Sequence, residues 1–296
     1  MVLPLVKHGS GGTFSRYNSL PDGWGNPGVL ATTPLTTDAA HVMFEDLAQL
    51  RCAHVGIRTD PVQQEVWQSA RHPKFHSIEH ATHTIELANG FDQFWTSTLS
   101  GATRTKIRKS EKRGVEVAVA DTRVSLPLFY SIYEAWTIER AERRGIPSRV
   151  ALIAAHKRDP YRKFEVVARI FGPRFLLWVA SLDGRPIAAN AQLIFGLHST
   201  YWRGYGLRDL AGRSRASYLL QSKMIEEACR QDCRWHHLGE SGGVASLEHF
   251  KERFGAERLT YLQYYNERLP VMQSKRAFGK LQALGERLAI KARRPR

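Results

Sequence analysis

Residues 238–256 read LGESGGVASLEHFKERFGA, and they form the most informative stretch of the chain. An apolar strand is predicted to end at Leu238, a Gly-Gly pair interrupts the chain, and a helix is predicted over residues 245–254. Apolar residues on this helix are spaced by three and four, which predicts one buried face: Leu247, Phe250 and Phe254. We therefore expect a strand, a tight turn and a helix packed against a core.

Lys251 follows Phe250 directly, which places it about 100° further round the helix. Its aliphatic stem can run along the apolar face while the ammonium reaches toward a cleft. A cation in such surroundings suits stabilisation of an oxyanion, or binding of a phosphate. The alternative is an exposed helix face. Glu240 and Ser241 lie in the preceding turn, where a polar pair either orients an amine or simply caps the turn.

Two earlier stretches carry further information. Residues 104–117 read RTKIRKSEKRGVEV, a basic helix that runs into a strand, with six basic residues against Glu111 up to position 113. Residues 175–191 read FLLWVASLDGRPIAANA, in which Asp-Gly predicts a β-hairpin. The basic helix is either a solvated face or a surface for a polyanion, in which case binding should weaken as salt rises.

Taken in order, the three stretches resemble the FemAB-like branch of the GNAT (N-acyltransferase) superfamily, and the resemblance extends from about Leu3 to Tyr265. It implies an α/β (α+β) fold of two GNAT-like lobes, each a mixed sheet flanked by helices. The lobes are expected at residues 1–121, the first of them short at its N-terminus, and at residues 122–265. A basic C-terminal helix and tail are expected at residues 266–296.

The pattern of apolar residues predicts the elements in more detail. We expect a strand over residues 1–7, a long loop from Gly9 to Pro34, a helix that Asp38 caps, and a single helix over residues 92–113. Strands that form hairpins beside helices exclude a strictly alternating Rossmann sheet.

The resemblance also implies a function. Fem-type transferases pass an aminoacyl group from aminoacyl-tRNA to an amine on a cell-wall precursor, whereas more distant relatives are acetyltransferases. By this resemblance Lys251 takes a catalytic role, and we expect Phe250 and Glu240 to be catalytic residues with it. We expect the following residues to bind substrate: Tyr201, Arg203, Tyr205, Ser241, Asn26 and Lys7.

A coenzyme A site in this superfamily is a loop of the form Arg/Gln-x-x-Gly-x-Gly/Ala at a helix N-terminus. Residues 206–216 read GLRDLAGRSRA, which has the glycines and arginines without that spacing. Arg208, Arg213 and Arg215 remain candidates for binding a phosphate. No bound cofactor is expected, and the co-substrate is either aminoacyl-tRNA or acyl-CoA.

Composition limits the partners. The chain has 296 residues, a net charge of +15 and a pI near 10.0, which favours polyanions or an anionic membrane surface. No apolar run approaches the roughly 18 residues that cross a bilayer, and the first residues do not form a signal peptide. Three cysteines fit a reducing cytoplasm. Cys229 and Cys233 lack a second ligand pair, so no metal site is expected.

The C-terminal segment has eight basic residues against Glu286 from position 270 on, and an apolar stripe. Such a helix either packs on the protein or lies on an anionic membrane, so the protein could be peripheral to the inner membrane. The main interpretation is an acyl- or aminoacyl-transferase of cell-envelope peptidoglycan or polysaccharide biosynthesis. The alternatives are an acetyl-CoA-dependent N-acetyltransferase and a non-catalytic GNAT-like module that binds nucleic acid or a membrane.

Overall fold

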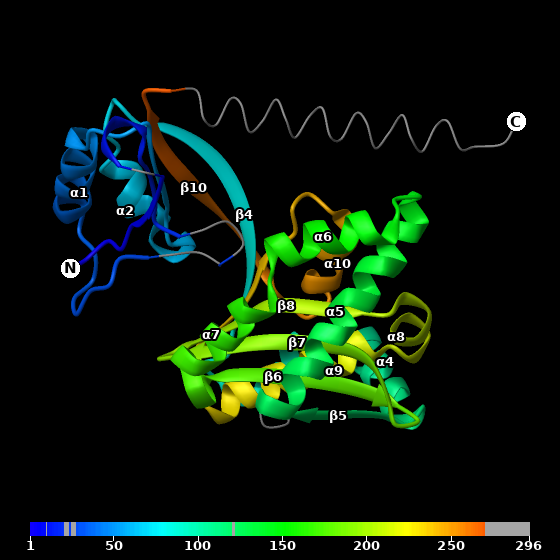
Figure 1. Ribbon diagram of the computed structural model, residues 1–296. Helices are drawn as coiled ribbons and strands as arrows, with labels where there is room; N and C mark the ends of the chain where they lie inside the picture. The colour runs from blue at the N-terminus through cyan, green and yellow to red at the C-terminus, as the bar shows by residue number, and fades with distance from the viewer. Residues whose placement is uncertain (10, 21–23, 25–27, 120–121, 270–296) are drawn as a thin grey trace, which may run out of the picture. The chain divides into compact units, whose positions relative to one another are not determined.

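A computed structural model describes the chain apart from residues 10, 21–23, 25–27, 120–121 and 270–296 (Figure 1). The C-terminal helix expected from Val271 and the candidate residue Asn26 therefore lie outside the described residues. The chain divides into two compact units, Met1–Thr82 with the segment from Leu259 on, and His83–Arg258.

The first unit has the sheet order β1-β2-β3-β10-β4, in which β2 and β3 are parallel and the other recorded pairs are antiparallel. Its elements are β1 (Val6–His8), β2 (Arg16–Asn18), α1 (Thr37–Gln49), β3 (His54–Arg58), α2 (Gln64–Ser69), the first part of β4 (His76–Glu86) and most of β10 (Glu257–Glu267). Edge-to-face aromatic contacts around Phe44 fill its core, since Trp67, Phe75 and Tyr264 all lie 5.0–5.5 Å from that ring.

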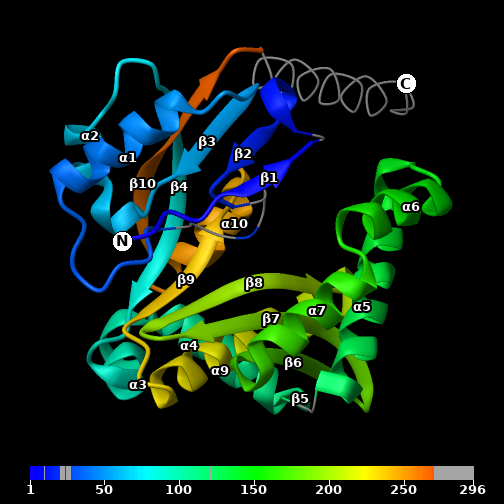
Figure 2. The same cartoon turned by 60° about the vertical axis from the view of Figure 1, so that its left-hand side comes forward.

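The second unit carries the rest of the sheet in the order β9-β8-β7-β6-β5, with β4 beside β9 (Figure 2). Its remaining elements are α3 (Gly90–Gln93), a π-helix (Phe94–Thr98), α4 (Gly101–Lys112), β5 (Val115–Val119), α5 (Thr122–Arg144), α6 (Ser148–Arg158), α7 (Tyr161–Phe171), β6 (Phe175–Leu182), β7 (Arg185–Phe195), β8 (His198–Gly206), α8 (Arg208–Ser214), α9 (Ala216–Arg230), β9 (Trp235–Glu240) and α10 (Ala245–Glu252). Helices α4 and α9 cover one face of these strands, and α5 with α7 covers the other (Figure 1). The prediction of a mixed α/β fold is confirmed.

The unit boundaries differ from the boundary expected at residue 121. The segment that contains α4 and β5 belongs to the second unit because α4 packs against α9 and β5 pairs with β6. The last described strand, β10, pairs with β3 and so returns to the first unit.

Several predicted element boundaries are wrong. The N-terminal strand is confined to Val6–His8, and Arg16–Asn18 forms a strand inside the expected loop. Thr36 caps α1 in place of Asp38, since its hydroxyl accepts a hydrogen bond from the Ala39 amide. The helix expected over residues 92–113 is interrupted, because the Ser100 hydroxyl accepts from the Thr103 amide and starts α4 anew.

Candidate active site

Strands β8 and β9 diverge in the second unit. They pair in parallel over His198–Thr200 and Trp235–His237, where the recorded register ends. On its other side β8 pairs with β7 along its whole length, so β8 is held firmly. The backbone groups at the end of β9, including the carbonyl of Gly239, are thereby left for side chains or ligands.

Lys251 forms a hydrogen bond with one of these backbone groups. Its side chain is buried, with 5% exposed, and its Nζ donates a hydrogen bond to the Gly239 carbonyl oxygen at 2.7 Å. The alternative of an exposed helix face is therefore wrong. Burial lowers the pKa of Lys251 to about 8, against the opposing effects of Glu240 and Glu248. An ammonium of this kind is partly desolvated and close to its titration point.

Helix α10 is oriented by its aromatic residues. Phe250 and Phe254 both contact the ring of Tyr218 on α9, with centroids 5.1 and 5.8 Å away. Leu247 is predicted on the same face, but it lies in the first turn of α10 and is 48% exposed. Phe250 therefore contributes packing that fixes the neighbouring lysine.

The end of α10 is fastened to the start of α4. The hydroxyl of Thr103 donates to the Arg253 carbonyl at 3.0 Å. Gly255 follows with φ +74°, and a Cβ there would lie 2.9 Å from the Thr98 carbonyl oxygen and overlap the Thr98 methyl group. The positive φ and the close approach to Thr98 both require glycine at position 255. They explain the pair Phe254-Gly255 near the end of the stretch 238–256.

We expect Gly255→Ala to destabilise the protein by about 3 kcal/mol, roughly 1 from the positive φ and 2 from the overlap with Thr98. Gly114→Ala is the matched control, since Gly114 has φ +76° and an added Cβ there would meet no other atom within 4 Å. Urea unfolding of both variants measures the difference. Equal losses would show that the contact with Thr98 does not hold α10.

Two buried polar groups near this lysine have no hydrogen-bond partner within the described part of the chain. They are the Oγ of Ser241, in the predicted turn, and both ring nitrogens of His83 on β4. Burial lowers the pKa of His83, and the charge of Lys251 lowers it further. Sequence reasoning missed His83, because a histidine in an alternating strand carries no signal of its neighbours. Glu240 is exposed at the end of β9.

The predicted substrate residues on β8 divide between the two faces of the sheet. Tyr201 packs on the side of α9, and its hydroxyl fills the space beside Gly204. Burial raises the pKa of Tyr201 to about 12. Tyr205 lies on the other side, where its ring is 4.6 Å from that of Tyr133. Burial also raises the pKa of Tyr205.

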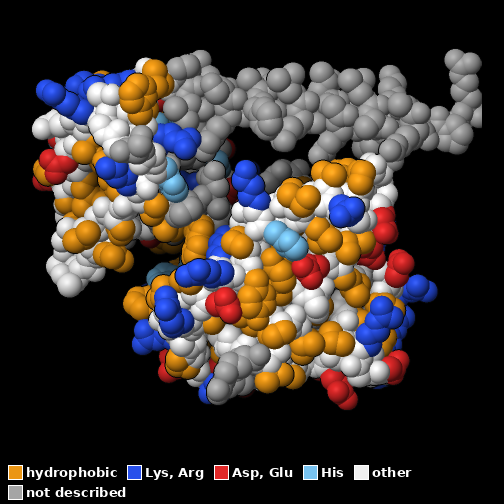
Figure 3. Space-filling model, viewed as in Figure 1, with side chains coloured by type: hydrophobic (Ala, Val, Ile, Leu, Met, Phe, Trp, Pro, Cys, Tyr) orange, Lys and Arg blue, Asp and Glu red, His pale blue; other side chains and the backbone are white. Residues whose placement is uncertain are grey.

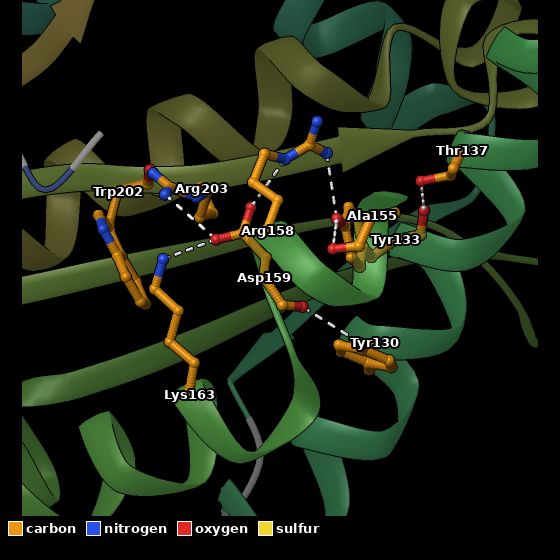
Figure 4. A network of polar contacts seen from close by, with 9 residues as sticks. All are labelled: Tyr130, Tyr133, Thr137, Ala155, Arg158, Asp159, Lys163, Trp202 and Arg203. Atoms are coloured by element: carbon orange, nitrogen blue, oxygen red, sulfur yellow. Dashed lines mark hydrogen bonds and ion pairs between the residues drawn. The ribbon is translucent and has the colours of Figure 1, made fainter. Parts of the chain in front are cut away.

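Arg203 belongs to a charged network around Asp159 (Figure 4). The carboxylate is 2% exposed and accepts hydrogen bonds from Lys163 at 2.7 Å, Arg203 at 3.4 Å and Arg158 at 3.3 Å. The guanidinium of Arg203 also lies 5.0 Å from the Trp202 ring. Three cations thus contact one buried carboxylate on this face of the sheet.

The predicted phosphate residues lie on and beside α8. Residues 208–214 form this short helix in place of an open glycine-rich loop, and the amide of Arg208 at its start donates to the carboxylate of Glu139 at 3.0 Å. The carbonyl of Arg213 accepts a hydrogen bond from Arg113, and Arg215 has φ +65° between α8 and α9. Both side chains are exposed. Lys7 is exposed on β1, in the other compact unit from the remaining candidates.

Much of the basic charge on α4 is used within the protein. Arg104 donates to the carbonyls of Trp95 and Leu99, and Lys106 donates to the Tyr218 hydroxyl. No group of three or more residues that could hold a metal ion occurs among the described residues. His236 instead bonds Ser199 and Gln221, and burial lowers its pKa to about 3.

Comparison with known proteins gives one family and several structures. A family model described as an acetyltransferase (GNAT) domain matches residues 100–252. Curated protein sequences give no match. The crystal structure of FemX is similar with a TM-score of 0.64 and 11% identity, over 89% of this chain and 83% of that one.

Two further structures are similar. The C-terminal domain of a putative lysylphosphatidylglycerol synthetase from Agrobacterium fabrum has a TM-score of 0.56 at 11% identity, over 88% of this chain and 80% of that one. L-PGS from Bacillus licheniformis has a TM-score of 0.53 at 10% identity, over 97% and 86%. At such identities the likeness concerns the fold.

Proposed function

The chain belongs to the GNAT acetyltransferase family, whose domain model matches just over half of it, and from that premise we propose that it transfers an acyl or aminoacyl group to an amine. The observation that carries the proposal is the buried ammonium of Lys251 at the point where β8 and β9 diverge. The packing of Phe250 fixes the position of Lys251. Glu240 and Ser241 follow directly after Gly239, whose carbonyl Lys251 contacts.

In the proposed reaction the neutral acceptor amine attacks the carbonyl carbon of the donor. The tetrahedral intermediate carries an oxyanion, which the Lys251 ammonium stabilises. Collapse of the intermediate breaks the bond to the leaving group, which takes up the proton that the amine loses. The buried Ser241 hydroxyl, which has no partner in the described part of the chain, would orient the amine. On the other face, the cations Arg203 and Lys163, gathered around Asp159, suit an acceptor that carries a carboxylate or phosphate.

Two observations favour aminoacyl-tRNA over acyl-CoA as the donor. Residues 206–216, where a coenzyme A pyrophosphate loop would stand, have glycines without the spacing of that loop, and the amide of Arg208 already donates to the Glu139 carboxylate. Arg208, Arg213 and Arg215 extend from this region, and the whole chain has a net charge of +15, which suits a long polyanion. FemX and the two synthetase structures share this fold.

Donor choice is tested by thermal unfolding with two probes. We expect a pool of aminoacylated bacterial tRNA to stabilise the protein, by about 2.7 kcal/mol at a hundredfold excess over the dissociation constant. Acetyl-CoA at millimolar concentration should leave the melting temperature unchanged, and uncharged tRNA controls for the aminoacyl group. Stabilisation by acetyl-CoA alone would assign the protein to the N-acetyltransferases instead.

The acceptor is proposed to be an amine-bearing precursor of cell-envelope peptidoglycan or polysaccharide, and the reaction is placed in the cytoplasm. None of the described helices is both long and apolar enough to span a bilayer. The basic segment 266–296 is proposed to add a peripheral contact with the membrane, through its cationic residues and apolar stripe.

A further inference from the structure

Helix α6 is attached to the second unit along one side only. Its residue Ala155 is 2% exposed, and the carbonyl of Ala155 accepts a hydrogen bond from the hydroxyl of Tyr133 on α5. His156 forms a hydrogen bond of 2.7 Å with the carboxylate of Glu134, which is also on α5. These contacts fix which side of α6 faces outward.

The outward side carries large aliphatic residues. Val150 is 58% exposed and Ile153 is 71% exposed, and a spacing of three places them on one face of the helix. Ala154 is exposed next to them. Figure 3 shows hydrophobic side chains gathered over the part of the second unit that α6 occupies. Single exposed aliphatic residues are ordinary, but two adjacent ones on a short helix form a small apolar face.

Basic residues border this apolar face. Arg149 and Lys157 are exposed, and neither forms an ion pair within the described residues. Arg158 is 61% exposed at the end of the helix, although it bonds Asp159. Between residues 139 and 158 the sequence has six basic residues and two acidic ones. The surface around α6 is therefore both apolar and cationic.

We infer that the outward face of α6 docks on an anionic lipid surface, with Val150 and Ile153 entering the headgroup region and Arg149 and Lys157 meeting lipid phosphates. An aliphatic face with basic borders is the composition of helices that lie in a membrane interface. RNA would match the charges but would leave the two aliphatic side chains without a favourable contact. A second copy of the chain would bring like charges together. The inference is independent of the transfer reaction and of segment 266–296.

The test is sedimentation of the full-length protein with vesicles of equal parts phosphatidylglycerol and phosphatidylcholine. We expect the double variant Val150→Ser with Ile153→Ser to bind about tenfold more weakly than the parent. The matched control is Val124→Ser with Ile170→Ser, which removes aliphatic residues of similar exposure, 60% and 69%, from α5 and α7. The control should bind as the parent does, and all variants should keep the parent's melting temperature.

Further arms separate the sources of binding. The double variant Arg149→Gln with Lys157→Gln should bind these vesicles more weakly, and its binding should depend less on salt. Vesicles of phosphatidylcholine alone should bind none of the proteins. A chain ended at Gly279 should still lose affinity when Val150 and Ile153 are replaced. Unchanged vesicle binding of the α6 double variant would overturn the inference. The inference would also be overturned if the α6 double variant lost tRNA binding or self-association while its vesicle binding stayed intact.

Discussion

Replacing Lys251 with Met should lower turnover by about two to three orders of magnitude, the usual loss when one stabiliser of an oxyanion is removed. Methionine keeps an unbranched apolar side chain at this buried position and removes the ammonium that donates to the Gly239 carbonyl. Steady-state transfer to an amine acceptor, with the donor that stabilises the protein, measures the effect. A non-catalytic binding module would show almost no change.

The pH dependence of the parent adds a second measurement. The pKa of Lys251 is about 8, so the protonated and active form should be lost as the pH rises through 8. This decline should be absent from the residual activity of Lys251→Met. Lys223→Met is the matched control, because Lys223 pairs with Glu226 on the surface of α9 and should keep full activity.

Folding should not suffer in the Lys251 variant. Its pKa is lowered from 10.5 to about 8 by burial, so the unfolded chain binds the proton more tightly than the folded one. The charge therefore costs about 3 kcal/mol of stability at pH 7. Loss of the hydrogen bond to the Gly239 carbonyl offsets about 1 kcal/mol of this gain, so Lys251→Met should be more stable by about 2 kcal/mol. A variant that is both inactive and less stable would mean that Lys251 acts through the structure of α10.

Local signals in the sequence predicted those parts of the site that a single element determines. Asp183-Gly184 joins β6 to β7 as expected, and both residues have positive φ in the turn. The position of Lys251 beside a buried Phe254 also follows from helical spacing alone. Helix α6 escaped prediction because only Ala155 is buried on it, so its apolar residues show no inward stripe.

Features that depend on two strands could not be predicted in the same way. Alternation along β8 would place Tyr201, Arg203 and Tyr205 on one face. The register shifts at Ala191/Gln192, where Trp202 is the extra residue of β8, so Tyr201 turns to the opposite face. A shift of one residue exchanges the two faces of a strand, and nothing within residues 201–205 reveals it. The network of Arg203 with Asp159 could not be predicted either, because Asp159 directly follows α6, a helix that the sequence did not predict.

Replacing Asp159 with Asn should destabilise the protein by about 3 kcal/mol at pH 7. The variant keeps the shape of the side chain but removes the negative charge that Lys163 and Arg203 contact, and these cations are only 16% and 18% exposed. Removing one partner of a buried ion pair typically costs about 3–5 kcal/mol, and partial exposure places this case at the lower end. Urea unfolding measures the loss, with Asp183→Asn in an exposed turn as the control.

The pH dependence of that loss identifies its cause. Burial raises the pKa of Asp159, but the hydrogen bond from Lys163 and the charge of Arg203 outweigh it, so the pKa is lowered overall. The stability that the ionised carboxylate provides is therefore complete above the unfolded pKa of about 3.9, and it is lost as the pH falls through the lower folded value. The difference between parent and Asp159→Asn should accordingly shrink below about pH 4. A difference that stays constant down to about pH 3 would mean that Asp159 stabilises this face by shape and neutral hydrogen bonds, and that the positions of the cations proposed to bind an anionic acceptor do not depend on its ionisation.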